Sequence, residues 1–284
     1  MSAFLMSSLA WLICQGERGT RYRLVRPLGT PARDKPSNVW LAIDDSRPDA
    51  EYVIKIPPGD NNHNGKLFAK GSMIRRLVDY VPESELAGPM MVFEAFTDSL
   101  WDARNARPFT TKEIKWIMKG VLLGIYTVHM KGLVYTVSKP STREITSLTY
   151  RSPEVHFGRP WSSSTDVWSW GIILAQLFQA QVDFISPGMY DSIRTGSMRK
   201  KRDAIRDQLA VDFDLSSLPF YAEDEQCARI LPTPQPETAY MWANTMVEKG
   251  VSHEDIQFLV EILHPDPNAR LTVREILESE YLDG

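Results

Sequence analysis

The chain has 284 residues, of which 43% are hydrophobic and 24% charged, and it carries a formal net charge of −4. This composition is typical of soluble globular proteins and excludes the disordered, collagen-like and membrane-spanning classes. Because nucleic-acid-binding proteins usually carry a basic excess, the acidic balance argues against nucleic acid as a partner.

The N-terminal residues carry no recognisable targeting signal. Residues 3–14 form an apolar run without a preceding Lys or Arg and without a small-residue cleavage site after it, which favours a packing segment over a signal peptide. A run of this length is too short for a bilayer, which takes about 20 residues. Cys14 and Cys227 are too few for a disulfide framework or a four-cysteine zinc site. We therefore expect no membrane association and a location in the cytoplasm or the nucleus.

Residues 22–96 contain short, β-like apolar runs. The runs lie at 22–25, 39–43, 52–56, 74–81 and 90–93, and turn residues separate them. This spacing predicts an antiparallel sheet.

From residue 110 onward the apolar period becomes helical. Thr110 with Glu113 three positions later predicts a capping box at the start of a helix. Apolar residues then recur at three- and four-residue spacing, at positions 114, 117, 121, 122, 125 and 128. Further helices are predicted over 165–178, 253–263 and 273–282. The sequence thus predicts an α+β fold with a small β-rich N-terminal lobe and a larger helical C-terminal lobe.

Two charged features were weighed as binding sites. The basic cluster at residues 198–202 is more typical of a solvated helix face than of a docking site for phosphate or an acidic partner. The five histidines show no metal-ligand spacing, which argues against a metal held by histidine alone.

Several stretches in order between residues 22 and 282 resemble motifs of the protein kinase family. Residues 52–55, which read YVIK, resemble the third-strand V-A-I-K, whose lysine binds the nucleotide phosphates. Residues 91–96 resemble the fifth strand and the hinge, with Phe93 as gatekeeper and the backbone of 94–96 facing adenine. The resemblance implies nucleotide contacts by Leu28, Gly29, Val39, Val53, Lys55, Phe93, Glu94 and Phe96.

The downstream half resembles the family most specifically. Residues 150–154, YRSPE, resemble the A-P-E end of the activation segment, and 166–171, DVWSWG, resemble D-x-W-S-x-G. In that family the glutamate pairs with a buried arginine, which the segment HPDPNAR at 264–270 supplies. Structural roles are therefore implied for Glu154, Asp166 and Arg270, and the YR pair and residues 97–100 resemble the cyclin-dependent and MAP kinase branch.

The resemblance implies a bilobal protein-kinase-like domain over residues 22–284. It places a lobe boundary near residue 96, with an N-lobe of about 22–96 and a C-lobe of about 97–284, after an N-terminal extension of 1–21.

The groups that perform catalysis in that family are missing. Val137 stands where the catalytic-loop aspartate is expected, and valine cannot act as a base. Glu154 follows it by only 17 positions (154 − 137 = 17), an interval that contains Glu144 as its single earlier acid and no aspartate. Asp-Phe-Gly occurs nowhere in the chain. Part of the catalytic and activation segment is therefore absent, no catalytic residue and no metal ligand is assigned, and Mg²⁺ binding is not expected.

The residues expected to bind the nucleotide also depart from the family pattern. No glutamate lies between residues 56 and 82 to pair with Lys55, and the glycine loop keeps Gly29 without its second and third glycines. Val53 replaces a small alanine above the purine. ATP binding stays open.

Two functional hypotheses follow. The first is a pseudokinase, a kinase-like domain that transfers no phosphate and acts through a protein partner. The second is an incomplete form of an active Ser/Thr kinase that transfers the ATP γ-phosphate to protein hydroxyls. Activity based on Glu144 or Asp98 as base is disfavoured, since nothing would hold Mg²⁺. The oligomeric state stays open, and the missing segment predicts exposed apolar surface on the helix over 114–134.

Overall fold

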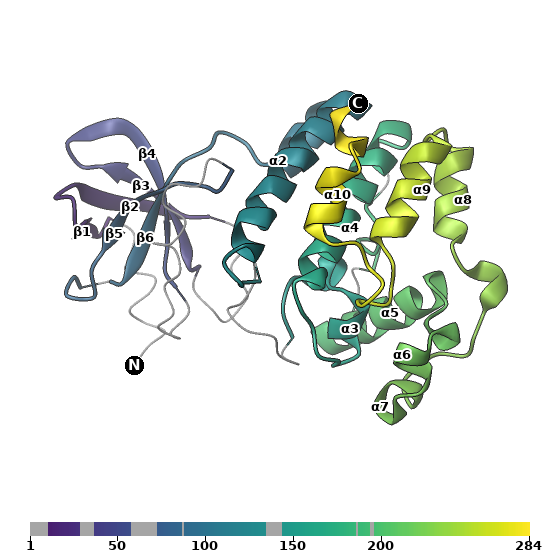
Figure 1. Ribbon diagram of the computed structural model, residues 1–284. Helices are drawn as coiled ribbons and strands as arrows, with labels where there is room; N and C mark the ends of the chain where they lie inside the picture. The colour runs from purple at the N-terminus through teal and green to yellow at the C-terminus, as the bar shows by residue number, and fades with distance from the viewer. Residues whose placement is uncertain are drawn as a thin grey trace. The chain divides into compact units, whose positions relative to one another are not determined.

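The computed structural model describes residues 11–28, 37–57, 73–86, 88–134, 144–185, 187–193 and 196–284. The chain divides into two compact units, Met1–Ser99 and Leu100–Gly284 (Figure 1). Gly29 and Val137, both singled out above, lie outside the described residues. Within the described ranges, no helix combines the length and the hydropathy that a membrane span requires.

The first unit is an antiparallel sheet, as the apolar runs predict. Its strands are β1 (Ile13–Gln15), β2 (Arg21–Pro27), β3 (Val39–Asp44), β4 (Arg47–Lys55), β5 (Leu77–Val81) and β6 (Met90–Glu94). They are ordered β1-β2-β3-β4-β6-β5, and each neighbouring pair is antiparallel. β1 falls within the residues assigned to an N-terminal extension and pairs with β2, with Ile13 opposite Arg23. The run expected from residue 74 becomes a strand only at Leu77.

The register of the central strands sorts their side chains onto two faces. Trp40, Ala42, Ile54 and Val92 are buried together on one face and form the core of the unit. The alternating residues of the same strands face the other way, since side chains in a strand point to opposite sides in turn. Val53 lies opposite Phe93, and Lys55 lies opposite Val39 and Met91. Four of the residues implied to contact a nucleotide therefore share one face of the sheet.

The second unit is helical. Its helices are α1 (Leu100–Ala106), α2 (Thr111–His129), α3 (Pro153–His156), α4 (Ser164–Val182), α5 (Met198–Asp212), α6 (Pro219–Ala222), α7 (Glu225–Ala228), α8 (Met241–Glu248), α9 (His253–Ile262) and α10 (Val273–Glu278). Short 3₁₀ turns lie at η2 (Leu148–Tyr150), η3 (Leu215–Ser217), η4 (Pro236–Thr238) and η5 (Tyr281–Asp283). The helices predicted near 110, 165 and 253 are confirmed, and the last predicted helix is divided between α10 and η5. This arrangement confirms the α+β class.

The predicted capping box starts α2. The Thr110 hydroxyl accepts a hydrogen bond from the Glu113 backbone N–H at 3.2 Å, and Glu113 accepts one from the Thr110 N–H at 2.8 Å. Arg107 donates to the same carboxylate from Nη1 at 2.9 Å. The Arg107 hydrogen bonds, followed by the Thr110 N–H, lower the pKa of Glu113 to about 2. The first turn of α2 is therefore fixed by charge-assisted bonds.

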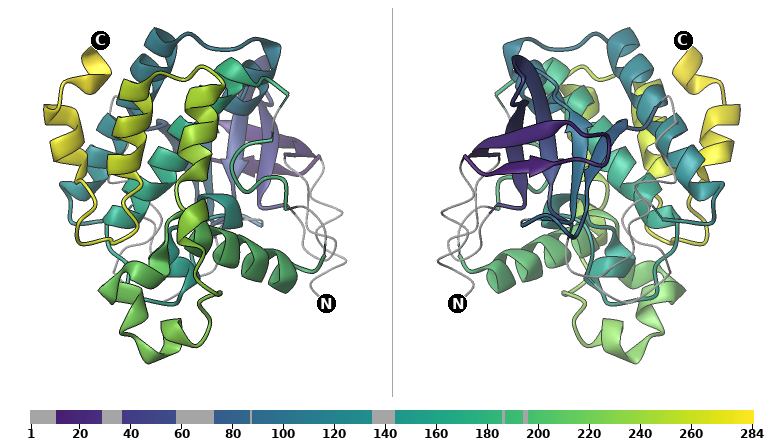
Figure 2. Two further views of the ribbon diagram at one scale, coloured as in Figure 1. Left: turned by 90° about the vertical axis from the view of Figure 1, so that its right-hand side faces the viewer. Right: turned by 90° about the vertical axis from the view of Figure 1, so that its left-hand side faces the viewer.

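α2 and α4 form the centre of the helical core. Trp170 of α4 is buried and donates from its indole N–H to the Met118 carbonyl of α2 at 3.0 Å. The other side of α4 packs Trp168 and Ile172 against α5. α10 and η5 lie beside α2, as both views of Figure 2 show. In this contact the amine of Lys115 lies 3.9 Å from the centre of the Tyr281 ring.

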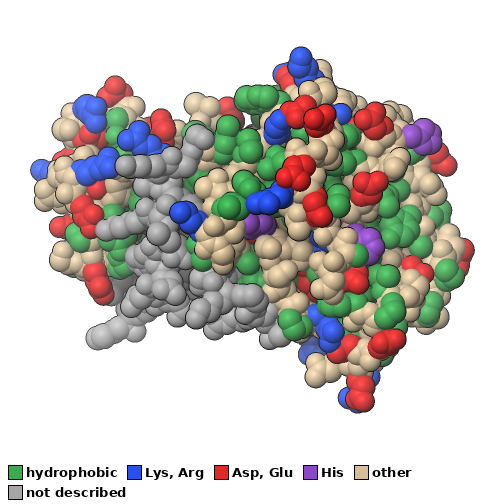
Figure 3. Space-filling model, viewed as in Figure 1, with side chains coloured by type: hydrophobic (Ala, Val, Ile, Leu, Met, Phe, Trp, Pro, Cys, Tyr) green, Lys and Arg blue, Asp and Glu red, His purple; other side chains and the backbone are tan. Residues whose placement is uncertain are grey.

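Not every apolar position of α2 is buried. Ile114, Leu122, Ile125 and Val128 belong to the core, whereas Val121, which the spacing placed on the same face, is 40% exposed. That expectation was wrong because position 121 lies off the stripe that faces α4. Trp116 is 78% exposed, and Figure 3 shows apolar side chains among charged ones over this region.

Candidate functional site

The face of the first unit that carries Lys55 holds four of the residues implied to contact a nucleotide, namely Val39, Val53, Lys55 and Phe93. Leu28 follows β2, and its backbone N–H donates to the Val39 carbonyl at 2.8 Å, which places the two residues side by side. Val53 is 7% exposed and lies opposite Phe93 across the strand pair. The sheet therefore brings together the described members of the set from β2, β3, β4 and β6.

Among the described residues, the neighbours of Lys55 are an aromatic ring and a second cation. The Lys55 amine lies 5.7 Å from the centre of the Phe93 ring, and within the described residues no acidic side chain pairs with it. Although Lys55 keeps contact with solvent, desolvation and then the charge of Arg75 lower its pKa. The positive charge of Lys55 is thus destabilised by its surroundings rather than balanced by them.

The segment expected to act as a hinge, residues 94–96, is engaged by Arg75. The Arg75 guanidinium donates to the Glu94 carbonyl oxygen from Nε at 3.0 Å and from Nη2 at 2.5 Å. The same guanidinium lies 4.6 Å from the centre of the Phe96 ring and 5.9 Å from that of Phe93. Burial is the main cause of a lowered pKa of Arg75. Sequence reasoning missed this residue, and the only available signal was a basic pair, Arg75 and Arg76, just before β5.

In the second unit, Glu144 is the acidic residue that precedes Glu154 in the shortened segment, and it forms ion pairs with two arginines. Glu144 pairs with Arg202 of α5 at 2.9 Å and with Arg151 at 3.3 Å. Arg151 also donates from Nε to the Ile145 carbonyl at 2.9 Å. Glu144, Arg151 and Arg202 line a pocket of about 290 Å³ together with Arg199. Arg202 of the basic cluster therefore pairs with an acid, while the Arg199 side chain is 83% exposed, as a solvated face predicts.

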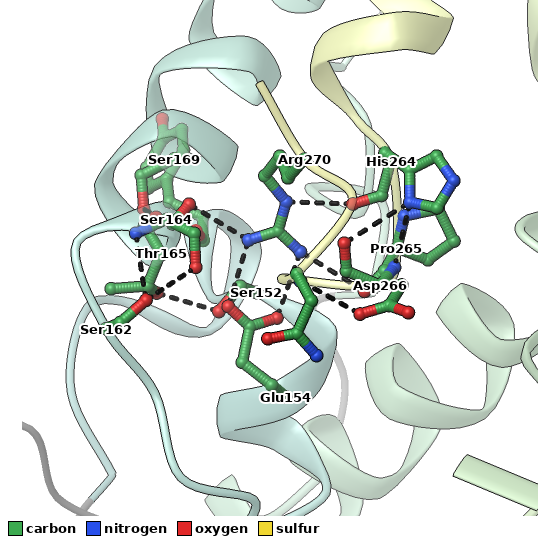
Figure 4. Close-up of polar contacts among 12 residues, drawn as sticks. Ser152, Glu154, Ser162, Ser164, Thr165, Ser169, His264, Pro265, Asp266 and Arg270 are labelled. Carbon is green, nitrogen blue, oxygen red and sulfur yellow. Dashed lines mark hydrogen bonds and ion pairs between the residues drawn. The ribbon is translucent and has the colours of Figure 1, made fainter. Parts of the chain in front are cut away.

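The ion pair expected between Glu154 and Arg270 is present and fully buried. Arg270 donates to the two carboxylate oxygens at 2.9 and 3.0 Å, and both side chains are 0% exposed (Figure 4). The remaining guanidinium donors are bound by the carbonyls of Ser164, His264 and Pro265. Since a buried charge is tolerated only when it is paired and hydrogen-bonded, this network ties α3 to the loop after α9.

Asp166 begins α4 and faces the end of α2. Its carboxylate lies 2.9 Å from Nε2 of His129, and it is 4% exposed. His129 was not singled out in the sequence analysis, because a contact over 37 positions leaves no local signal. The pair fixes the last turn of α2 against the first turn of α4.

Two groups in the segments expected to bind Mg²⁺ and adenine, the Glu144 carboxylate and the Glu94 carbonyl, are engaged by arginines. In the described ranges, no group of three or more His, Cys, Asp or Glu side chains could hold a metal ion. Glu144 is bound to two arginines, and no aspartate lies between residues 135 and 154. The Glu94 carbonyl, which the resemblance assigns to the hinge, accepts hydrogen bonds from Arg75.

Comparison with known proteins agrees with this architecture. A model of the protein kinase domain matches residues 136–282. The Caenorhabditis elegans protein named serine/threonine kinase NLK is 27% identical over 152 residues, which is 50% of this chain and 21% of that protein. The match therefore spans about a fifth of the length of this relative. The family model covers half of the chain, and the helical unit contains the buried Glu154–Arg270 pair that the family motifs predict. This chain therefore belongs to the protein kinase domain family.

Proposed function

We propose that this chain is a pseudokinase: it keeps the kinase-like framework, transfers no phosphate and acts through a protein partner. The observation that carries the proposal is a contrast within one unit. The framework pair Glu154–Arg270 is completely buried and fully hydrogen-bonded, whereas the interval before it lacks any aspartate.

The chemistry of phosphoryl transfer supports the same proposal. A kinase works almost entirely by positioning the phosphates and neutralising their charge with Mg²⁺ and cationic groups. Val137 cannot accept a proton, and Glu144 is neutralised by Arg151 and Arg202. Mg²⁺ binding is therefore not proposed, and a cytoplasmic or nuclear location is proposed with the pseudokinase.

A phosphoryl-transfer assay tests the proposal. The full chain is incubated with radiolabelled ATP, Mg²⁺ and generic protein substrates, beside the variant Lys55→Met. We expect no incorporation above that of the variant, because the sequence between residues 135 and 154 contains no aspartate to act as base or to hold Mg²⁺. Incorporation that rises with Mg²⁺ and is abolished by Lys55→Met would contradict the proposal.

The second candidate is an incomplete form of an active Ser/Thr kinase. It is favoured by the shape of the loss: family-like sequence flanks a shortened interval between residues 136 and 141 and another near residues 70 and 71. Loss of catalytic residues by single substitutions would more often preserve the length of the segment. Sequencing the native transcript across the codons for 70–71 and 135–154 separates the two candidates, since additional in-frame sequence with the catalytic aspartates supports the active kinase.

A further inference from the structure

The Glu94 carbonyl oxygen is the polar group on which the nucleobase preference of the hinge depends. A backbone carbonyl can only accept hydrogen bonds, so an open hinge carbonyl favours a base that presents a donor. Adenine presents such a donor through its 6-amino group, whereas a 6-oxopurine such as hypoxanthine presents an acceptor at the same position. In this chain the oxygen already accepts two hydrogen bonds from Arg75.

Arg75 competes for this oxygen with two advantages over a 6-amino group. Its donors are charged, and charge-assisted hydrogen bonds are about twice as strong as neutral ones. Its guanidinium also lies 4.6 Å from the centre of the Phe96 ring, within the range of a cation–π contact. An incoming adenine must therefore displace a group held by two kinds of contact.

The bound guanidinium also changes what the hinge offers. Arginine has five N–H donors and no acceptor, and two of the five are directed at Glu94. The remaining donors leave a cationic, donor-rich edge beside Phe96 in place of an open acceptor. An edge of this kind matches the acceptor oxygen of a 6-oxopurine and offers no acceptor to a 6-amino group.

We propose that Arg75 determines the nucleobase specificity of this hinge, replacing the acceptor of Glu94 with guanidinium donors so that a 6-oxopurine nucleotide is preferred over an adenine nucleotide. The proposal rests on the hinge assignment that accompanies the proposed function, and it does not depend on whether phosphate is transferred.

Equilibrium binding of two nucleotides tests this proposal. The full chain is titrated with inosine triphosphate and with ATP, which differ at position 6 of the purine, in EDTA so that no metal contributes. The quantity compared is the ratio of the two dissociation constants. Arg75→Met keeps the unbranched stem near Phe96 and removes every donor, and Arg76→Met is the matched control, because Arg76 is the exposed neighbour and makes no hydrogen bond to Glu94.

We expect the native chain and Arg76→Met to bind inosine triphosphate more tightly than ATP. Arg75→Met should bind ATP about 2- to 10-fold more tightly than inosine triphosphate, the effect of one regained hydrogen bond. Thermal unfolding verifies that each variant is folded. If Arg75→Met does not fold, Arg75→Lys replaces it, since lysine keeps the charge and loses the paired guanidinium donors. Its ratio of dissociation constants should lie between that of the native chain and that expected for Arg75→Met.

Three results would overturn the proposal. The first is a native chain that binds ATP as tightly as inosine triphosphate or more tightly. The second is a ratio of dissociation constants that Arg75→Met leaves unchanged. The third is the absence of binding of either nucleotide to both the native chain and Arg75→Met, because removal of the guanidinium should then have uncovered a site. None of these results bears on phosphoryl transfer, so failure of this proposal and failure of the pseudokinase proposal are distinguishable.

Discussion

At the scale of single residues, His156 of α3 is a group that resists protonation in the folded chain. Its side chain is buried, Nε2 lies 3.1 Å from the Leu148 carbonyl, and Nδ1 has no hydrogen-bond partner. Burial, followed by the charge of Arg151, lowers its pKa to about 3. The neutral imidazole therefore donates from Nε2 to Leu148, and protonation of Nδ1 would bury an uncompensated charge.

This residue predicts a loss of stability on acidification. In the unfolded chain histidine binds a proton near pH 6.5, whereas folded His156 does not, so the free energy of unfolding falls as the pH drops from about 6.5 toward 3. At pH 5.5 the expected loss from this group is about 1.4 kcal/mol relative to neutral pH. Urea unfolding at pH 7.5 and 5.5 measures it, and His156→Gln, which keeps a donor for Leu148, should lack this part of the loss. An equal pH dependence in both proteins would contradict the assignment.

The buried ion pair gives a second prediction at this scale. Arg270→Met or Glu154→Gln removes one side of a pair that is 0% exposed and strands its partner. Each single variant should lower the free energy of unfolding by about 3–5 kcal/mol. Arg229→Met is the control, since Arg229 pairs with Glu225 at 3.3 Å while both are exposed, and it should cost less than about 1 kcal/mol. Denaturant unfolding measures the free energy of unfolding of each variant. Equal decreases for the buried-pair variants and for Arg229→Met would contradict the prediction.

At the scale of elements, the contact between α4 and the end of α9 depends on Gly171. A Cβ at this position would lie 2.7 Å from Leu263 Cδ2 and 2.8 Å from Ile262 Cγ2, closer than packed carbons normally approach. Alanine would add about 1 kcal/mol of helix propensity, but overpacking in a core costs typically about 1–3 kcal/mol. The glycine of the D-x-W-S-x-G motif is thus explained by close helix packing.

Gly171→Ala should therefore destabilise the chain by up to about 2 kcal/mol. The effect should be smaller in the background of Leu263→Ala, which removes the nearest atom, so a double-mutant cycle measured by chemical denaturation gives a favourable coupling. Additive costs of the two substitutions would show that the contact is not the cause.

The elements that could be predicted from the sequence were those with a strong local signal. The strands at 22–25 and 52–56 and the start of α2 at Thr110 follow from alternation and a capping pattern. β1 was missed because three residues carry too little pattern, and Val121 was misplaced because 3.6-residue periodicity does not locate the edge of a buried stripe. Local sequence fixes the type of an element more firmly than the limits of its buried face.

At the scale of the whole molecule, family motifs anticipated the framework of the helical unit better than the nucleotide face. The Glu154–Arg270 pair joins residues 116 positions apart and was reached only through the motif resemblance. Arg75 was not reached, because nothing in a single sequence shows that a side chain before β5 turns onto a backbone carbonyl of β6. A sequence shows which family residues are missing. Only the structure shows which other side chain contacts the group concerned, as Arg75 contacts the Glu94 carbonyl.

The exposed apolar surface of α2 predicts how the isolated chain behaves in solution. Trp116 is 78% exposed and Met130, just after the helix, is 59% exposed, and exposed apolar surface promotes association unless a partner covers it. Trp116→Arg should raise the concentration at which the chain begins to scatter light, with little change in the free energy of unfolding, because the side chain contributes little to the core. Leu86→Ser, at a side chain 92% exposed in the first unit, is the control and should leave association unchanged. Association that persists unaltered in Trp116→Arg, or that Leu86→Ser reduces equally, would show that another surface is responsible.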